Sequence, residues 1–253
     1  MNHKLRQKSI INKIKMQGSV TTNELIDEFD VSVMTIRRDL QALENEGYIT
    51  LVHGGAKWNN HAILEHPMSL KQTEYSAQKR RIGQYCATLV NENDLIFIGT
   101  GTTTQVVGEE LINLDHVTLY TNSLMAMESL SSFSNIELHS TPGKYRALSH
   151  GFLGSETIQF LKHHLFDYAF ISTEGIDLNF GASVPALEDA LTKQAVIEQT
   201  KHVILISDHT KFNKTFNHQF CTLDQVEMII TDSELDDETY QSFLQKGLKI
   251  VRV

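Results

Sequence analysis

Residues 22–56 read TNELIDEFDVSVMTIRRDLQALENEGYITLVHGGA, and this stretch decides the fold of the first part of the chain. We expect Thr22 to cap one short helix, and Ser32, the last residue of a three-residue turn that begins at Asp30, to cap the next one. Hydrophobic residues recur at helical spacing in the second helix and predict its buried face. That face is expected to consist of Ile36, Leu40 and Leu43.

The opposite face of this second helix has residue types that suit the edges of DNA bases. Its members are Met34, Thr35, Arg37, Arg38 and Gln41. An arginine offers a planar fork to guanine edges or phosphate oxygens, and threonine and glutamine reach base edges in the major groove. For the arginine pair taken alone, a merely solvated charged face is an equal alternative. The capped helices, the short turn and the glycine pair that follows favour DNA binding.

A strand and a glycine hairpin complete this region. Residues 48–53 alternate between hydrophobic and polar side chains, and Gly54-Gly55 follows directly. Glycines at a hairpin tip allow a close approach to the sugar-phosphate backbone, which predicts a wing.

An earlier helix is expected from about Lys4 to Met16, and Gly18 is expected to end it. Its predicted apolar stripe consists of Leu5, Ile10, Ile11 and Ile14. Its predicted solvent face consists of Lys4, Arg6, Lys8, Lys13 and Lys15.

The segment VSVMTIRRDLQALENEGYITLVHGGA resembles the winged helix-turn-helix signature of the DeoR/GlpR family of bacterial transcriptional regulators. The resemblance implies sequence-specific binding to double-stranded operator DNA, usually to repress a sugar-utilisation operon. The residues expected to contact DNA are Thr22, Ser32, Met34, Thr35, Arg37, Arg38, Gln41, His53, Gly54 and Gly55. The family commonly has arginine where this chain has Leu51, which leaves His53 and Lys57 to hold the backbone phosphates.

Length, composition and charge are those of a small domain followed by a larger one. The chain has 253 residues, of which 41% are hydrophobic. Residues 1–57 hold eight Lys or Arg and seven Asp or Glu, whereas the rest holds 14 and 24. The acidic remainder is expected to point away from the phosphates of a DNA partner. We therefore predict a DNA-binding domain over 1–57, a linker over 58–76 and a larger domain over 77–253.

Several classes of protein are disfavoured by the sequence. No apolar run approaches about 18 residues, and the start MNHKLRQKS lacks a hydrophobic signal region, so we expect a cytoplasmic protein without membrane partners. Cys86 and Cys221 are either free thiols or a pair, and a reducing cytosol favours free thiols. The 12 histidines, His163-His164 included, show no metal-ligand spacing, so neither a metal nor a cofactor is expected.

From Ala77 onward, short apolar segments alternate with helical patterns, which predicts an α/β domain with a mostly parallel sheet. The expected strands are 95–98, 117–120, 136–139, 168–171, 203–206, 228–230 and 248–253. The expected helices are 77–91, 104–111, one from about 124, 155–163, 186–199 and 236–246. Ligands of such sheets bind outside the carboxyl ends of the strands, so the loops there are the candidate site.

The loop 99–104 reads GTGTTT and lies between a predicted strand and a predicted helix. Backbone N–H groups and the positive end of a helix dipole favour an anion there, and three hydroxyls add donors. A plain turn with a helix cap explains this loop equally well. The loop lacks the lysine of a P-loop and the G-x-G-x-x-G spacing of a dinucleotide site.

Four further polar loops follow predicted strands, at 121–123, 141–146, 172–177 and 207–211. Each by itself is more simply a turn. Because all five loops lie at one edge of the sheet, together they predict a pocket for a small, polar, negatively charged molecule.

The larger region also resembles the sensor domain of the same family, which is similar in fold to ribose-5-phosphate isomerase and glucosamine-6-phosphate deaminase. The matching segments are GTGTTT, TNSL, TPGKYR, STEGID, EDALTK and SDHTKF. The resemblance implies a Rossmann-like α/β domain and a phosphorylated sugar effector, whose phosphate rests on Thr102, Thr103 and Thr104 together with Lys211. The residues expected at this site are Gly99, Thr100, Gly101, Thr102, Thr103, Thr104, Asn122, Lys144, Arg146, Gly175, Asp189, Lys193, Asp208 and Lys211.

Two departures from the family pattern bear on this site. Many members have Asp-Ser at Gly99-Thr100 and Gly-Gly at Pro142-Gly143. The first departure removes a carboxylate that would bind a hydroxyl. The GTGTT and DHTK forms are similar to the lactose phosphotransferase repressor branch of the family, which implies tagatose 6-phosphate. Asp189 and Lys193 are four residues apart, so a helix-surface pair is the alternative for them.

Two functions follow from these observations. The first is a ligand-controlled transcription factor, a homodimer or homotetramer that presents two DNA-binding domains to a symmetric operator. The second is a sugar-phosphate isomerase or deaminase that carries a DNA-binding domain, and it needs a carboxylate base near the substrate carbon. The available carboxylates are Asp177, Glu188, Asp189 and Asp208, but no spacing fixes a catalytic pair.

Overall fold

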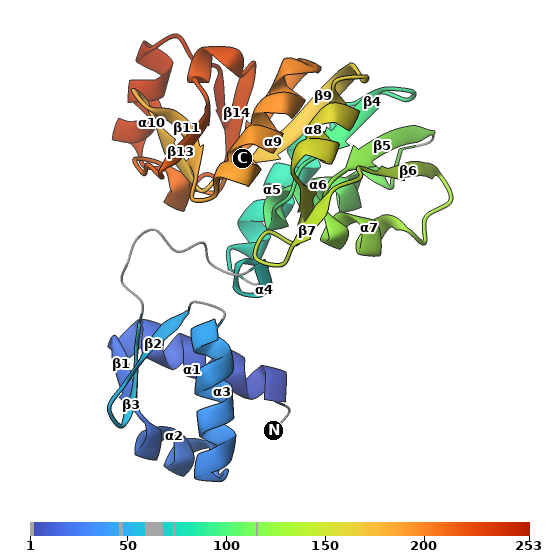
Figure 1. The fold of residues 1–253 in the computed structure, drawn as a ribbon. Coiled ribbons are helices and arrows are strands. Elements are labelled where there is room, and N and C mark those ends of the chain that lie inside the picture. Colours follow the sequence, from blue (N-terminus) through green and yellow to red (C-terminus); the bar gives the residue numbers. More distant parts are fainter. Residues whose placement is uncertain (1–2, 46–47, 59–67, 73, 115) are drawn as a thin grey trace. The chain divides into compact units, whose positions relative to one another are not determined.

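The computed structural model describes residues 3–45, 48–58, 68–72, 74–114 and 116–253. The chain divides into two compact units, residues 1–71 and residues 72–253 (Figure 1). Each unit has its own hydrophobic core.

The first unit is a winged helix-turn-helix domain, as predicted. Its elements are α1 (His3–Gln17), β1 (Ser19–Thr21), α2 (Thr22–Phe29), α3 (Val33–Asn45), β2 (Ile49–Val52) and β3 (Gly55–Trp58), with α4 (Met68–Lys71) after them. The three strands form an antiparallel sheet in the order β1-β3-β2. The predicted inner face of α3 is confirmed, because Ile36, Leu40 and Leu43 are buried.

Two side chains of α1 lie opposite to the prediction. Ile10, Ile11 and Ile14 are buried as expected, but Leu5 is 59% exposed and Arg6 is only 6% exposed. Arg6 turns inward because it finds a carboxylate partner on α3. The side that carries Arg6 is therefore not purely a solvent face.

The cap of α2 is Thr21 rather than Thr22. The Thr21 side chain accepts a hydrogen bond from the N–H of Glu24, and the Glu24 side chain accepts one from the N–H of Thr21 at 2.7 Å. These reciprocal bonds form a capping box, which lowers the pKa of the Glu24 carboxyl. The prediction for Ser32 is confirmed, because its hydroxyl accepts a hydrogen bond from the N–H of Thr35 at 3.2 Å.

The predicted domain boundary at Lys57 cuts through a strand. Trp58 belongs to β3 and pairs with Ile49 of β2, so the first unit includes at least one more residue. The predicted linker 58–76 also contains α4, and α5 begins at Ser76. Most of its remaining residues, 59–67, lie outside the described part of the chain.

The second unit is built on a seven-stranded parallel sheet in the order β15-β14-β12-β9-β4-β5-β6. Its strands are β4 (Leu95–Ile98), β5 (Val117–Thr121), β6 (Ile136–Ser140), β9 (Phe166–Ser172), β12 (Thr200–Ile206), β14 (Met228–Thr231) and β15 (Ile250–Arg252). All seven predicted strands are present. The strand order reverses between β4 and β9, which are neighbours in the sheet.

Helices cover both faces of this sheet (Figure 1). They are α5 (Ser76–Ala87), α6 (Thr102–Leu111), α7 (Leu124–Leu130), α8 (Ser155–Leu161), α9 (Leu187–Glu198) and α10 (Asp237–Gln245). Successive strand residues alternate between the two faces: Ile96 and Ile98 pack in the core with α5, α6 and α7, whereas Phe97 packs in the core with α8, α9 and α10. This doubly covered parallel sheet is the expected Rossmann-like arrangement.

Two small β structures were not predicted. β10 (Gly175–Asp177), β11 (Gly181–Val184) and β13 (His218–Cys221) form an antiparallel sheet, and β7 (Lys144–Arg146) pairs with β8 (Gly151–Leu153). Part of the predicted loop 141–146 is therefore a strand. The chain also forms two single 3-10 turns, His209–Lys211 and Leu223–Gln225.

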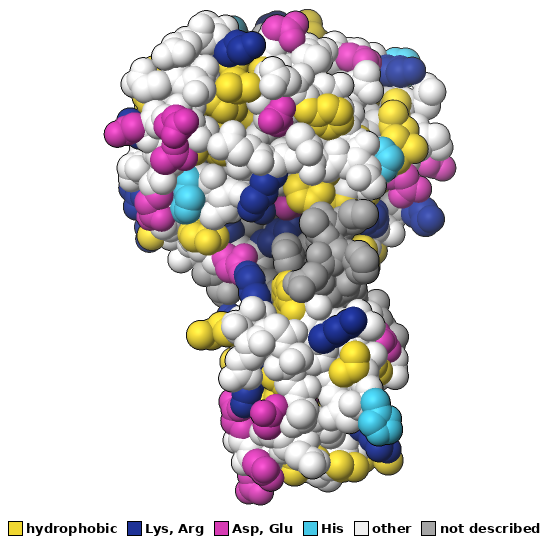
Figure 2. All heavy atoms as spheres, turned by 90° about the vertical axis from the view of Figure 1, so that its left-hand side faces the viewer, with side chains coloured by type: hydrophobic (Ala, Val, Ile, Leu, Met, Phe, Trp, Pro, Cys, Tyr) yellow, Lys and Arg dark blue, Asp and Glu magenta, His cyan; other side chains and the backbone are white. Residues whose placement is uncertain are grey.

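Acidic and basic side chains are interspersed over the face of the second unit that Figure 2 shows. Cys86 and Cys221 are buried free thiols, in agreement with the favoured alternative. Burial raises the pKa of Cys86 and raises that of Cys221 to about 12. Within the described ranges, no helix is both long and apolar enough to cross a membrane.

Candidate DNA interface and effector site

The outer face of α3 presents two guanidinium groups to solvent. Arg37 and Arg38 are both exposed, and neither makes a hydrogen bond or ion pair with the described residues. Met34, one turn earlier, is 59% exposed. Two unneutralised cations on the outer face of a helix are chemically suited to phosphate oxygens and guanine edges.

Polar contacts fix both ends of this face. At the start of α3, the hydroxyls of Ser32 and Thr35 lie 2.9 Å apart. Near its end, the Gln41 amide donates to one oxygen of Glu44 at 3.0 Å, and the other oxygen accepts the N–H of Leu51 at 2.9 Å. Glu44 therefore connects α3 to the wing strand β2.

Of the three wing residues predicted to contact DNA, two are exposed and one is buried. Gly54 has φ +78° and is exposed, as is His53. Gly55 is buried in β3, where a Cβ would lie 2.1 Å from Val20 O. Strand packing, rather than the predicted approach to DNA, therefore explains why residue 55 is a glycine. Leu51, which replaces the family's arginine, is half-buried against the core of the first unit.

The predicted effector loops lie where β4 and β9 end side by side. The N–H of Gly99 donates to Phe170 O at 3.1 Å, and the Ser172 hydroxyl donates to Thr100 O at 2.9 Å. Gly101 has φ +141°, and a Cβ there would lie 2.2 Å from Ser172 Oγ. Only glycine allows the chain to pass this close to β9 before it enters α6.

Helix α6 begins at Thr102, two residues earlier than predicted. Its first N–H groups have no acceptor within the helix, so they are available to an anion. The Thr104 hydroxyl does not join them as the resemblance implied. It is fully buried and lies 2.8 Å from both Gly99 O and Gly101 O, to which it donates.

A small cavity lies beside this loop. Its lining residues are Phe97, Gly99, Thr100, Asn122, Ile171, Thr192, Lys193 and Val196. The Asn122 amide nitrogen donates to Phe152 O at 3.2 Å, which ties the end of β5 to β8. The Asn122 Oδ1 atom is buried and accepts no hydrogen bond from the described residues. A buried acceptor of this kind can take a hydrogen bond from a hydroxyl group or from a water molecule.

Asp189 and Lys193 form a buried pair next to this cavity, so the helix-surface alternative is wrong. Each side chain is 6% exposed, and Lys193 Nζ lies 3.9 Å from Asp189 Oδ1. Lys193 Nζ also donates to Ser172 O at 3.0 Å, and the Thr100 hydroxyl donates to Asp189 Oδ1 at 3.4 Å. The pair therefore connects α9 to the loop that follows β4 and to the last residue of β9.

Lys211 lies in the loop after β12 and is paired with a carboxylate that the sequence did not single out. Its Nζ donates to Glu174 Oε2 at 3.1 Å. Burial lowers the pKa of Lys211, but the charges of Glu174 and Asp208 outweigh it and hold that pKa above the usual value. Asp208 Oδ1 accepts the N–H of Thr210 at 3.1 Å and caps the turn.

Most of the predicted effector residues do not line the cavity, and Lys144, Arg146 and Gly175 are among them. Lys144 on β7 is exposed, and Arg146 Nη1 donates to Ser149 Oγ at 3.3 Å. Gly175 is buried at the start of β10, where a Cβ would lie 2.5 Å from Lys214 O. Close packing against Lys214 therefore explains why residue 175 is a glycine.

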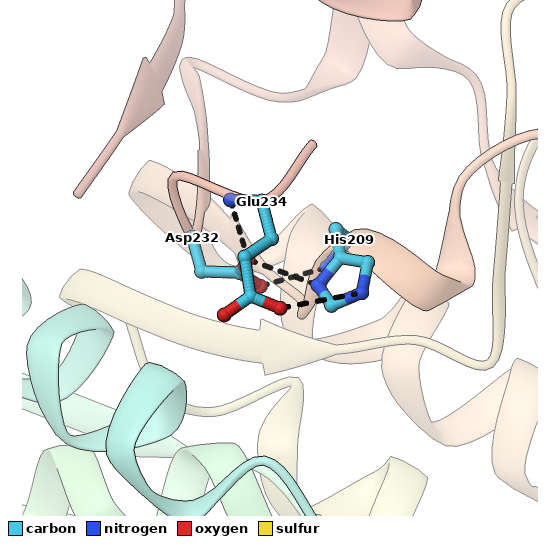
Figure 3. Close-up of side chains that lie close together, drawn as sticks. All are labelled: His209, Asp232 and Glu234. Atoms are coloured by element: carbon cyan, nitrogen blue, oxygen red, sulfur yellow. Dashed lines mark hydrogen bonds and ion pairs between the residues drawn. The ribbon is translucent and has the colours of Figure 1, made fainter. Parts of the chain in front are cut away.

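A cluster of His209, Asp232 and Glu234 was not predicted (Figure 3). Asp232 is fully buried. Its two oxygens accept hydrogen bonds from the backbone N–H of His209 at 2.8 Å and that of Glu234 at 2.9 Å, and one of them lies 2.9 Å from His209 Nδ1. These bonds occupy Asp232, and His209 Nε2 lies 3.8 Å from a carboxylate oxygen of Glu234. The three side chains thus pair with one another, and we assign them no metal.

The cluster instead joins three segments of the second unit. His209 lies in the loop of Lys211, and its ring meets the ring of Tyr75 edge-on with centroids 5.3 Å apart. Gln78, in the first turn of α5, donates to Glu234. The loop after β12 therefore touches the start of α5, the helix that follows the connection to the first unit.

Two family profiles match the chain. The profile of the DeoR-like helix-turn-helix domain matches residues 6–62, and that of the DeoR C-terminal sensor domain matches residues 74–233. The "Lactose phosphotransferase system repressor" of Staphylococcus epidermidis is 33% identical over 237 residues, 92% of this chain and 93% of that protein. The "Glycerol-3-phosphate regulon repressor" of Escherichia coli is 30% identical over 235 residues, 92% of each chain.

Among solved structures, "Ribose 5-phosphate isomerase from Plasmodium falciparum" is similar with a TM-score of 0.39 and 20% identity, over 57% of this chain and 53% of that one. The profiles together cover both units, and the relatives are aligned along nearly their whole length. The chain belongs to the DeoR family of DNA-binding transcriptional regulators.

Proposed function

We propose that this regulator represses a sugar-utilisation operon, that it reads its operator with α3 and the wing, and that a phosphorylated sugar releases it. The observation that carries the proposal is the pair of exposed guanidinium groups of Arg37 and Arg38, which have no partner among the described residues. A single exposed cation contributes little to binding. Two arginines on the exposed face of a capped helix that follows a three-residue turn, however, fit the major groove of DNA.

The N-terminal part of α3 and the wing supply the remaining contacts. Met34 and Thr35 lie in the first turn of α3, where side chains reach base edges, and Met34 offers an apolar surface to a thymine methyl group. His53 and Lys57 are exposed on the wing and fit the backbone phosphates. A homodimer or homotetramer would place two such faces on a symmetric operator.

The effector site is proposed at the ends of β4, β5 and β9. The first N–H groups of α6 and the ammonium group of Lys211 each suit a phosphate, and the buried Asn122 Oδ1 suits a hydroxyl of the sugar. The names of the lactose and glycerol-3-phosphate repressors support a phosphorylated carbohydrate or polyol. Tagatose 6-phosphate and glycerol 3-phosphate are therefore the first compounds to test.

Three of the four carboxylates that an enzyme could use are engaged elsewhere, which favours a non-catalytic sensor. Asp177 Oδ1 accepts the N–H groups of Asn179 and Phe180, and Asp208 caps its own turn. Asp189 is paired with Lys193, and Glu188 is exposed on α9. Proton abstraction from a sugar phosphate requires a carboxylate that is free to accept the proton.

The signal from effector to DNA-binding domain is proposed to pass through His209. An effector changes DNA affinity only if it binds one arrangement of the protein better than another. A phosphate that takes Lys211 from Glu174 alters the 208–211 loop, and His209 in that loop contacts Tyr75 just before α5. The chain leads directly from α5 back to the first unit.

Enrichment of random DNA duplexes with the full-length protein tests the first half of the proposal. We expect a palindromic sequence to be enriched, and its affinity to exceed that of a scrambled duplex at the same ionic strength. Enrichment of no sequence would contradict operator binding.

Calorimetric titration tests the second half. Tagatose 6-phosphate and glycerol 3-phosphate are compared with unphosphorylated tagatose and glycerol. We expect binding by at least one phosphorylated compound and none by its unphosphorylated counterpart. Turnover of a sugar phosphate by the purified protein would instead favour the enzyme alternative.

A further inference from the structure

A carboxylate occupies a core position of α3. Positions 36, 39, 40 and 43 have the spacing of a single helix face, and Ile36, Leu40 and Leu43 fill three of them. The fourth is Asp39, whose side chain is fully buried. A leucine would suit such a position better if the face served only to hold the helix in place.

Arg6 of α1 supplies the counter-charge. Its Nε donates to Asp39 Oδ2 at 2.6 Å, and the Arg6 side chain is 8% exposed. His3 Nε2 lies 3.1 Å from Asp39 Oδ1. That contact lacks hydrogen-bond geometry, and Oδ1 accepts no hydrogen bond from the described residues. Arg6 is thus the principal partner of Asp39, from a helix 33 residues away in sequence.

A buried ion pair of this kind contributes little net stability, but it fixes the relative position of the two helices that it joins. The desolvation of two charges offsets much of their attraction, and packed apolar residues of similar volume often replace such pairs without loss of stability. Apolar side chains tolerate small shifts of one helix along another, whereas a short charge-assisted hydrogen bond does not. Polar pairs at core positions of helices are known to fix register for this reason.

The register of α3 against α1 determines what the outer face of α3 presents. Arg37 and Arg38 directly precede Asp39, and each residue advances the helix by about 1.5 Å. A displacement of that size moves both guanidinium groups by half the spacing of two stacked base pairs. Hydrogen bonds to base edges are lost at such a displacement, whereas attraction to phosphates persists.

We propose that the buried Arg6–Asp39 ion pair is a positioning device, which fixes the register of α3 on α1 and thereby the discrimination of operator from other DNA. This inference rests on the proposed reading of DNA by α3. Its distinguishing property is that it affects discrimination without adding to the stability of the domain.

The test replaces both partners at once, with Arg6→Met and Asp39→Leu in the full-length protein. The probes are the palindromic duplex enriched by the wild-type protein and a scrambled duplex of the same composition. We expect the domain to remain folded, the affinity for the scrambled duplex to stay within about twofold, and the ratio of the two affinities to fall at least tenfold. A ratio equal to that of the wild type in a folded double variant overturns the proposal.

The matched control is a different ion pair of α1, between Lys13 and Glu28 of α2. It is partly exposed, so Lys13→Met with Glu28→Leu is expected to leave the affinity ratio within twofold. An equal loss of discrimination in this control would show that any change on α1 has the effect, and would also overturn the proposal.

A second variant decides the outcome if the double variant does not fold. Arg6→Lys keeps the charge but removes the planar fork, and we expect a folded protein whose affinity ratio is lowered at least threefold. An unchanged ratio in Arg6→Lys overturns the proposal. A wild-type protein that enriches no sequence would contradict the proposed function itself, which is a distinct result.

Discussion

The cations of α3 and those of the candidate effector site are arranged in opposite ways. Arg37 and Arg38 are exposed and have no partner among the described residues, whereas Lys193 and Lys211 already pair with Asp189 and Glu174. The surface of α3 can therefore attract phosphates without rearrangement. An anion that reaches Lys211 competes with a carboxylate that is already there.

This difference suits the two tasks proposed for the molecule. A DNA interface gains affinity and association rate from charges that are ready to bind. A sensor has to distinguish two states, and an exchange of partners at Lys211 supplies an interaction that differs between them. The first unit also contains a buried paired cation, Arg6, for which we propose a positioning role rather than a binding role.

The largest effect is expected where a buried pair is broken on one side. Arg6→Met leaves the Asp39 carboxylate unpaired in the core, which costs about 3–5 kcal/mol in the free energy of unfolding. The single tryptophan, Trp58, packs against the core of the first unit, so its fluorescence follows this unit during urea unfolding. Lys13→Met, which breaks a partly exposed pair, is expected to cost less than about 1 kcal/mol. Equal costs would remove the distinction between buried and exposed cations.

The next effect concerns the exposed cations. Arg37→Ala or Arg38→Ala should lower operator affinity by about 1–3 kcal/mol if the side chain reads a base, whereas a phosphate contact gives uniform weakening and a salt slope reduced by about one. Fluorescence anisotropy at several salt concentrations separates these cases. Arg80→Ala, on an exposed position of α5, is the control and should change nothing. Operator binding that survives in both α3 variants would refute the assignment of the recognition helix.

A change at His209 should act on the coupling between the two sites and not on either site alone. His209→Gln removes the ring that meets Tyr75 and the contact with Asp232, so we expect the effect of the effector on operator affinity to fall by about 1 kcal/mol or more. Calorimetry with effector and anisotropy with DNA should each stay within twofold of wild type. The control is His202→Gln, which breaks the pair between His202 on β12 and Glu227. Undiminished coupling in His209→Gln would exclude this route.

The carboxylate that occupies Lys211 should compete with the effector. Glu174→Gln removes this competitor, so we expect phosphate-bearing effectors to bind about 1 kcal/mol more tightly, roughly a fivefold gain. Glu188→Gln, on the exposed face of α9, should leave the affinity unchanged. Weaker binding by Glu174→Gln would mean that Glu174 itself holds the effector.

The smallest effect expected is the effect of pH above neutrality on the affinity for the effector. The folded-state pKa of Lys211 is raised, so its charge is fully present below its usual pKa and is lost only at higher pH. Effector affinity should therefore rise as the phosphate loses its second proton near pH 6, and stay constant from about pH 7 to 9. Calorimetry across this range checks the prediction. A steady fall above pH 7 would point to a different cation with a lowered pKa.

Local patterns were enough to predict most elements of both units. The spacing of Ile36, Leu40 and Leu43 predicts α3, and the alternation of apolar segments with helices predicts the parallel sheet. The cap of α2 also has a signal in the sequence, because Glu24 lies three residues after Thr21 and the two form the capping-box pattern. Asp39 likewise falls at a core position of a helix, which is a signal for a buried partner.

Contacts between distant segments were not accessible from local patterns. Nothing near Lys211 in sequence indicates its pairing with Glu174, 37 residues away, and nothing near Arg6 indicates Asp39. The short strands β10 and β11 are three and four residues long and include glycines, so they lack the length and the alternation that identify strands. The position of Asn122 opposite Phe152 depends on the unpredicted β7–β8 hairpin.

The most direct test of ligand-controlled DNA binding is one titration of the preformed complex of wild-type protein and its enriched operator duplex. Tagatose 6-phosphate or glycerol 3-phosphate is added in parallel with the unphosphorylated compound, and bound DNA is followed by anisotropy. We predict that one phosphorylated compound releases the operator, with DNA affinity lowered by roughly 5- to 150-fold, while its unphosphorylated counterpart does not. Equal release by both forms, or tight binding of the phosphorylated compound with no change in bound DNA, would contradict the account.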